Sequence, residues 1–386
     1  MNKIKVGIIG MGYIGVSHIE ALRRIGFVDL VAVADVNYAL AKKKAEDFNI
    51  PKCYATMEEL INDPEITAIH DCTPNHLHLD VNTAVIKAGK HIYSEKPLAM
   101  DSKQSAAMLK LLKEKPDVVA AVNFCYRMYP LMQDAKARIA SGEIGRPYLV
   151  HGSYLQDWLL FDTDYNWRIE PEYAGVSRCV GDIGSHWMDL AQVMVGSRIT
   201  EVCANTLIAL PKRKKPTTPV ESFAVNTNVE YKEVDVKTED YAGALLRFEN
   251  GVTGVFQCSQ ISAGRKCFID IEVDAEKASF HWNHEIGDRM WKGNRNSNNE
   301  EVMRNPNLMK SQARPYSYLA AGHPEGWNDA FKNGIEAFYR FIRDGKKQGK
   351  DPCDFATFQD GHYLILLTEA IIKSSKEQRW VKVEDI

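Results

Sequence analysis

The chain has 386 residues, enough for two domains of ordinary size. Apolar residues make up 45% of it and charged residues 26%, and the net charge is −3. Mixed charges of this kind argue against a nucleic-acid or membrane surface, and no apolar run reaches the roughly 18 residues of a membrane span. The basic run at 212–215 (KRKK) lies between prolines, and we interpret it as a solvated loop.

The eight cysteines are scattered along the chain. No two of them form a C-x-x-C pair, and none belongs to a Cys/His cluster with the spacing of a zinc site. Thiols in this arrangement are typical of a reducing compartment, so we expect a cytoplasmic protein. The N-terminal apolar run is short and interrupted by glycine, which argues against a signal peptide.

The first third of the chain alternates short apolar strands with helical segments. Strands are predicted at 4–9, 30–35, 68–72, 91–94 and 118–122. Helices are predicted between them, at 13–25, 41–48, 57–62, 79–88 and 102–113. This alternation predicts an α/β fold with a doubly wound parallel sheet.

A glycine-rich turn joins the first predicted strand to the first helix. It has the pattern G-x-G-x-x-G, and its expected cofactor-binding residues are Gly10, Gly12, Tyr13, Ile14 and Gly15. The glycines suit a tight turn, close approach of a pyrophosphate and close packing of helix on strand. Asp35 ends the second strand, where its carboxylate can accept hydrogen bonds from ribose hydroxyls and would repel a 2′-phosphate. The sequence therefore predicts NAD as the cofactor.

Polar residues also follow the later strands of the predicted sheet. Ligands of such sheets bind at the carboxyl ends of the strands. We therefore expect a second group of residues beside the cofactor, namely Thr73, Pro74, Asn75, His78, Glu95, Lys96 and Asn123.

The segment 181–186 (GDIGSH) is the most distinctive stretch beyond the first third. Asp182, His186 and Asp189 are four and then three residues apart, so a helix would place them on one face. Three interpretations fit this pattern alone: a metal site, a capped helix with an incidental histidine, or the acid/base group of an active site. No third ligand with convincing spacing accompanies Asp182 and His186, or His281 and His284, so we expect no metal.

Five motifs occur in an order that resembles the Gfo/Idh/MocA family of oxidoreductases: 10–15, 73–78 (TPNHLH), 95–97 (EKP), 167–168 (WR) and 181–186. The resemblance implies a Rossmann NAD-binding domain at 1–123 and a second α/β domain at 124–386. The second domain would have a large, mainly antiparallel sheet that binds substrate and forms a homodimer or homotetramer. The sequence pattern itself predicts strands there, at 147–154, 200–209, 240–248, 252–259 and 268–274.

The resemblance also implies that Lys96, Asp182 and His186 form the catalytic set. Hydride transfer from an alcohol needs a base for the hydroxyl proton and a donor that steadies the developing oxyanion. His186 suits the first role and Lys96 the second, while Asp182 would bind a substrate hydroxyl or orient the other two. Asp189 is expected to support the helix instead.

The remaining candidates surround the expected substrate. Arg168, Tyr126 and His323 are expected to contact it, and Trp167 is expected to stack near the nicotinamide. The alternatives are a surface ion pair for Arg168, packing at the domain junction for Trp167 and a structural role in a loop for His323. The substrate should be rich in hydroxyls, and 323–327 (HPEGW) is similar to family members that act on sugars and glycosides. We expect oxidation at a ring carbon of a pyranose. The alternatives are an inositol dehydrogenase or ketosugar reductase, an NAD-dependent glycoside hydrolase, and a non-catalytic sugar sensor.

Two segments depart from the family's pattern. Residues 176–179 (VSRC) stand where many relatives have a glycine run, and residues 283–315 form a long segment rich in Asn, Arg and Met.

Overall fold

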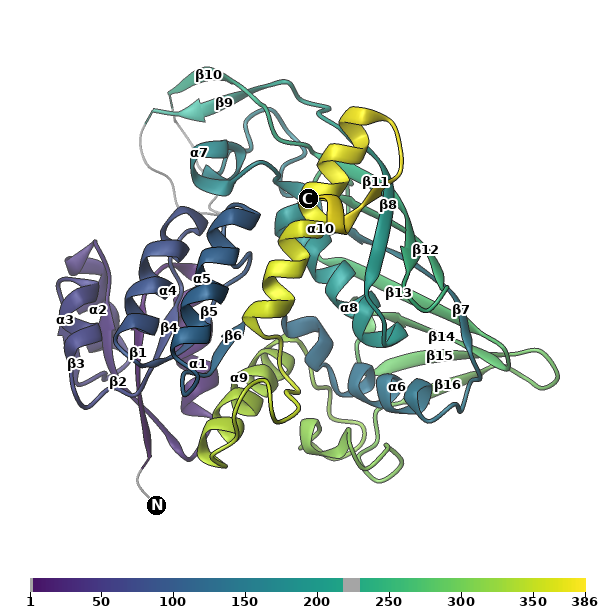
Figure 1. Ribbon diagram of the computed structural model, residues 1–386, viewed down its shortest axis with the longest axis horizontal. Coiled ribbons are helices and arrows are strands. Elements are labelled where there is room, and N and C mark those ends of the chain that lie inside the picture. Colours follow the sequence, from purple (N-terminus) through teal and green to yellow (C-terminus); the bar gives the residue numbers. More distant parts are fainter. Residues whose placement is uncertain (1–2, 218–229) are drawn as a thin grey trace. The chain divides into compact units, whose positions relative to one another are not determined.

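The computed structural model describes residues 3–217 and 230–386, and they form two compact units (Figure 1). The first unit comprises Met1–Met128 and Trp327–Ile365, and the second comprises Tyr129–Gly326 and Leu366–Ile386. The expected division placed all residues after 123 in the second domain, whereas residues 327–365 group with the first unit. The reason is helix α9 (Trp327–Arg343), which packs against α1 (Tyr13–Arg23) and buries Phe331, Ile335 and Phe338.

The first unit is built on a six-stranded sheet in the order β3-β2-β1-β4-β5-β6. Every neighbouring pair is parallel, which confirms the predicted doubly wound sheet. Its strands are β1 (Ile4–Ile9), β2 (Val28–Ala34), β3 (Lys52–Tyr54), β4 (Ala68–Asp71), β5 (His91–Ser94) and β6 (Ala120–Val122). The other helices are α2 (Tyr38–Asp47), α3 (Met57–Asn62), α4 (His78–Lys87) and α5 (Ser102–Glu114). Only β3 was not predicted; with three residues it is too short to show a pattern.

The second unit is built on a nine-stranded sheet in the order β16-β15-β14-β13-β7-β12-β11-β8-β17. Of the neighbouring pairs within the described residues, only β7 and β12 run parallel, so the sheet is mainly antiparallel, as predicted. The strands are β7 (Pro147–Leu155), β8 (Ile199–Leu207), β11 (Tyr241–Phe248), β12 (Thr253–Ser259), β13 (Phe268–Ala275), β14 (Ala278–Asn283), β15 (Arg289–Asn294), β16 (Glu300–Met303) and β17 (Val381–Lys382).

One face of this sheet is packed and the other is open. Helix α8 (Ser185–Val195) lies on the packed face, where Trp187 stacks on Phe256 of β12 with ring centroids 5.1 Å apart. Exposed Val255 alternates with the buried residues of β12, so the opposite face meets solvent. The remaining helices of this part of the chain are α6 (Pro130–Ala140), α7 (Pro171–Ala174) and α10 (Phe358–Glu377), which begins among the residues of the first unit.

Two segments for which the sequence predicted no strand contain strands. Residues 212–215 lie in β9 (Lys212–Pro216), which pairs with β10 (Tyr231–Asp235), so the solvated-loop interpretation was wrong. The misleading residue is Arg213, whose side chain is fully buried on Asp240 although its neighbours Lys212 and Lys214 are exposed. The segment 283–315 supplies β15 and β16, which extend the large sheet.

None of the described helices combines the length and the apolar character that a membrane crossing requires.

Candidate active site

The glycine turn between β1 and α1 fits a dinucleotide pyrophosphate. Gly10 has φ +96°, and a Cβ there would lie 2.6 Å from the carbonyl carbon and oxygen of Cys72. A Cβ on Gly15 would lie 2.4 Å from the carbonyl oxygen of Gly10. Gly12, in contrast, would direct a Cβ into open space at the start of α1. Gly10 and Gly15 therefore shape the turn, while Gly12 leaves room for a phosphate at the helix N-terminus.

Asp35 follows the end of β2 and lies beside the glycine turn. Its Oδ2 accepts a hydrogen bond of 2.7 Å from the backbone N–H of Met11, and its Oδ1 accepts one of 2.8 Å from Asn37. These bonds hold the carboxylate beside the glycine turn. Tyr13 is 71% exposed, so its ring is available to a ligand next to the same turn.

The loop after β4 is held by buried groups. Thr73 donates to Asp71 through its N–H (3.0 Å) and its hydroxyl (2.6 Å). His78 is fully buried, with Nδ1 2.8 Å from the carbonyl oxygen of Pro97 and Nε2 2.8 Å from that of Thr73. His78 thus ties the Thr73 loop to the Glu95–Lys96–Pro97 segment, and both of its ring nitrogens are used in doing so. Pro74 and Asn75 lie between these two anchors.

Glu95 lies at the centre of a buried polar network below Lys96. Its Oε1 lies 2.9 Å from Nε2 of His18 and accepts a bond of 2.6 Å from the side-chain amide of Asn123. Its Oε2 accepts a bond of 3.2 Å from the N–H of Lys96. Burial raises the pKa of Glu95, but His18 and Asn123 outweigh burial and lower it overall. The network therefore holds an ionised carboxylate that fixes the backbone at Lys96.

Sequence reasoning missed the residues that complete this network. His18 Nδ1 lies 2.6 Å from Nδ1 of His70, and His70 Nε2 lies 2.8 Å from the hydroxyl of Tyr339. Burial lowers the pKa of His70 well below its usual range, which keeps this imidazole neutral. These residues lie on α1, β4 and α9, so sequence spacing holds no signal that joins them.

The second unit carries Asp182 in a set of polar contacts. Its Oδ1 lies 3.2 Å from Nε of Arg168, and its Oδ2 accepts a bond of 2.9 Å from the side-chain amide of Gln260. The guanidinium of Arg168 also covers the ring of Trp167, with 4.4 Å from its carbon to the centroid. Arg168, Trp167 and Asp182 thus meet as one group. Gln260, which follows β12 and is fully buried, was not anticipated.

His186 follows Asp182 by four residues, but the two do not share a regular α-helix. Val180–Gly184 form a π-helical turn, and α8 begins at Ser185. His186 is 6% exposed, and its ring centroid lies 6.3 Å from that of Tyr154 on β7. The hydroxyl of Ser185 donates a hydrogen bond to the carbonyl oxygen of Gly181 (2.8 Å). Turns of the π type occur frequently at functional sites because they re-aim side chains.

The segment 176–179 anchors this turn from below. Glu239 is fully buried and accepts hydrogen bonds from the hydroxyl of Ser177 (2.6 Å) and from the N–H groups of Arg178 (3.1 Å) and Val180 (2.9 Å). Arg178 in turn forms an ion pair with buried Asp240. This chain thus has a charged anchor for the turn that carries Asp182.

Two further candidates have structural contacts. Tyr126 is 4% exposed and belongs to a 3₁₀ turn of the first unit. His323 is exposed, and its carbonyl oxygen accepts a bond from Arg304. The buried member of the 323–327 motif is Glu325, which pairs with Arg304 at 3.2 Å. Lys96 and Asn123 belong to the first unit, and Asp182 and His186 to the second.

Comparison with known proteins gives matches to both the N-terminal and the C-terminal part of the chain. A model of the "Oxidoreductase family, NAD-binding Rossmann fold" matches residues 4–124, and one of the "GFO/IDH/MocA C-terminal domain" matches residues 132–281. The levoglucosan dehydrogenase of Pseudarthrobacter phenanthrenivorans is 29% identical over 407 residues, which cover 100% of each chain. The myo-inositol 2-dehydrogenase of Thermotoga maritima is 24% identical over 99% of each.

A solved structure of levoglucosan dehydrogenase in complex with NADH and levoglucosan superposes on the chain with a TM-score of 0.88. It is 27% identical and covers 99% of this chain and 100% of its own. The NADH in that structure, the family model of the NAD-binding Rossmann fold and the glycine turn agree on the cofactor, which is NAD. The chain belongs to the Gfo/Idh/MocA family of NAD-dependent oxidoreductases.

Proposed function

We propose that the chain is an NAD-dependent sugar dehydrogenase that oxidises a ring hydroxyl of a pyranose-type substrate. The observation that carries this proposal is the polar group on the second unit: Asp182, held by Arg168 and Gln260, four residues before His186. Such a group offers several donors and acceptors to a molecule rich in hydroxyls. The first unit is proposed to bind NAD and the second to bind the substrate.

Each residue has a distinct role in this reaction. NAD, held by the glycine turn and Asp35, would supply the hydride acceptor when bound. His186 takes the hydroxyl proton as general base, and returns it when the reaction runs in reverse. The Lys96 ammonium donates a hydrogen bond to the oxygen as negative charge develops on it. Arg168 and Asp182 bind neighbouring hydroxyls and so hold the carbon that reacts in place.

The first unit prepares Lys96 for this role. Because Glu95 is fixed by His18 and Asn123, the backbone at Lys96 has little freedom, although Lys96 as a whole is only partly buried. Groups held in advance lose little entropy when the transition state forms.

The substrate class is supported by similarity over the whole chain to a levoglucosan dehydrogenase. A second candidate is oxidation of a cyclitol, supported by the similarity to a myo-inositol 2-dehydrogenase over 99% of the chain. Both substrates present a six-membered ring with secondary hydroxyls, so the same catalytic residues serve either one.

The test is NADH formation by the purified protein with levoglucosan, glucose, a methyl glucoside and myo-inositol. We expect turnover of at least one pyranose with NAD. Turnover of myo-inositol without any pyranose would replace the first candidate by the second. Lys96→Ala should lower kcat by about 10²-fold or more, while Lys103→Ala, which removes an exposed lysine on α5, should not. Full activity of the Lys96 variant would refute the catalytic assignment.

Two further properties are proposed for the whole protein. The open face of the nine-stranded sheet, with exposed Leu245 and Val255, supports a homodimer or homotetramer formed through this sheet. The eight cysteines are all free thiols, which supports a cytoplasmic location.

A further inference from the structure

The open face of the nine-stranded sheet carries an unusual row of ionisable side chains. Asp270, Glu272 and Asp274 alternate along β13 and therefore point to the same face. The sheet register places Glu272 opposite His151 on β7 and opposite His281 on β14. Three carboxylates and two imidazoles thus gather on three neighbouring strands, all within the second unit.

The charges in this row are poorly balanced. Asp274 Oδ2 lies 3.3 Å from His151 Nε2, and Asp270 Oδ2 lies 3.7 Å from His281 Nε2. Within residues 3–217 and 230–386, the side chain of Glu272 forms no hydrogen bond or ion pair, and no lysine or arginine pairs with any of the three carboxylates. Burial and the neighbouring Asp274 raise the pKa of Glu272. An additional positive charge would relieve this repulsion.

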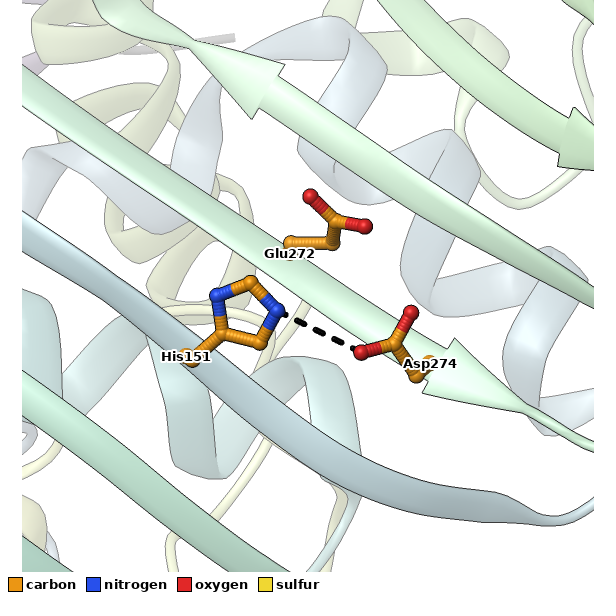
Figure 2. A group of neighbouring side chains, drawn as sticks. All are labelled: His151, Glu272 and Asp274. Atoms are coloured by element: carbon orange, nitrogen blue, oxygen red, sulfur yellow. Dashed lines mark ion pairs between the residues drawn. The ribbon is translucent and has the colours of Figure 1, made fainter.

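The geometry of three of these residues suits a metal ion. One ligand atom each from His151, Glu272 and Asp274 can be chosen so that all three lie within 4.8 Å of one another. Figure 2 shows the imidazole and the two carboxylates on the same side of the sheet.

We propose that His151, Glu272 and Asp274 bind a divalent metal ion of the Zn²⁺ type. One imidazole nitrogen and two carboxylate oxygens are a ligand set that borderline transition metals accept, whereas Mg²⁺ and Ca²⁺ prefer oxygen ligands alone. Ligand distances near 2 Å would need only small side-chain rotations, because all three residues are partly exposed. His281, opposite Glu272, is the nearest further imidazole in the sheet register.

The site is independent of the dehydrogenase chemistry, because none of its residues belongs to the catalytic set. It also runs against our expectation of no metal. That expectation rested on sequence spacing, and here the ligands come from strands more than a hundred residues apart.

The test is titration of the full chain with Zn²⁺ in competition with a chromophoric chelator. We expect one ion per chain with micromolar affinity, weakened at least ten-fold by His151→Gln and by Glu272→Gln. Glu301→Gln is the matched control, because it makes the same charge change in the same cross-strand row, on exposed β16. Thermal melts of each variant report folding, and Zn²⁺ should raise Tm in the wild type and in Glu301→Gln but not in His151→Gln or Glu272→Gln.

Crystals soaked in Zn²⁺ then locate the ion by its anomalous scattering, which separates this site from binding to thiols. An ion between His151, Glu272 and Asp274 supports the proposal. Either of two results would overturn it. The first is that no Zn²⁺ binds at a concentration about 100 times the expected micromolar Kd. The second is a Zn²⁺ affinity that His151→Gln and Glu272→Gln leave unchanged.

Discussion

Asp240 is the residue whose removal should most weaken the second unit. Its side chain is fully buried and pairs with two arginines, Arg178 and Arg213, whose side chains are also fully buried. Its other oxygen accepts hydrogen bonds from the backbone N–H groups of Ala209 (2.8 Å) and Leu210 (3.1 Å). Burial alone would raise the pKa of Asp240, but Arg178 outweighs it and the pKa is lowered, so the carboxylate is charged.

Asp240→Ala should therefore leave two buried guanidinium groups without a carboxylate. Removing one partner of a buried ion pair costs about 3–5 kcal/mol. For a unit of this size, each kcal/mol lowers Tm by about 2–4 °C, so we expect a fall of about 6–20 °C. The assay is thermal and urea unfolding followed by circular dichroism. Asp240→Asn keeps one of the two acceptor oxygens without the charge, and its stability should fall between that of the wild type and that of Asp240→Ala.

The matched control is Asp235→Ala, which removes an exposed carboxylate from β10. It should change the free energy of unfolding by less than about 0.5 kcal/mol. The reasoning fails if Asp240→Ala unfolds within about 1 kcal/mol of the wild type. In that case the carbonyl groups around Arg213, such as that of Leu159 at 2.8 Å, would suffice to hold the arginines.

Three further outcomes can be measured. Gln260→Leu should lower kcat/KM about ten-fold or more, because Asp182 loses a buried hydrogen-bond donor. A hydrogen bond to a charged group contributes about 1.5–3 kcal/mol. An unchanged kcat/KM would show that Asp182 does not need Gln260. Asp35→Ala should raise kcat/KM with NADP relative to NAD, since the carboxylate that repels a 2′-phosphate is gone. Lys52 lowers the pKa of Asp63 to about 2, so this pair stabilises the fold above about pH 4 and loses its effect as pH falls toward 2. Urea unfolding should thus find Asp63→Asn less stable than the wild type at pH 7, with a gap that narrows below about pH 4; a gap independent of pH would contradict this.

Local patterns predicted the elements of the first unit well. The strand at 4–9 and the short helix at 57–62 have the bounds that the sequence indicated. The glycine turn was readable because each glycine answers a backbone requirement, as the close approach of Gly10 to Cys72 demonstrates. Asp35 could be placed beside it because one βαβ unit fixes the distance from turn to strand end.

Spacing failed wherever a residue's role depends on a distant part of the chain. Helix α9 joins the first unit after the 198 residues from 129 to 326, and the sequence pattern holds no trace of this. In the sequence, Arg213 is one of four consecutive basic residues. It is nevertheless buried, because Asp240 and several carbonyl groups accept hydrogen bonds from its guanidinium. A buried charge depends on its partners, and partners are a property of the tertiary structure.

The sequence by itself determined most strands of the parallel sheet, the glycine turn and the family to which this chain belongs, because these depend on residues close together in the chain. Only the tertiary structure decided which side chains hold Asp182 and Lys96 in place. Gln260, His18, His70 and Tyr339 take part because strand order and helix packing bring them there. The same is true of His151, Glu272 and Asp274, which the register of two strands placed on one open face.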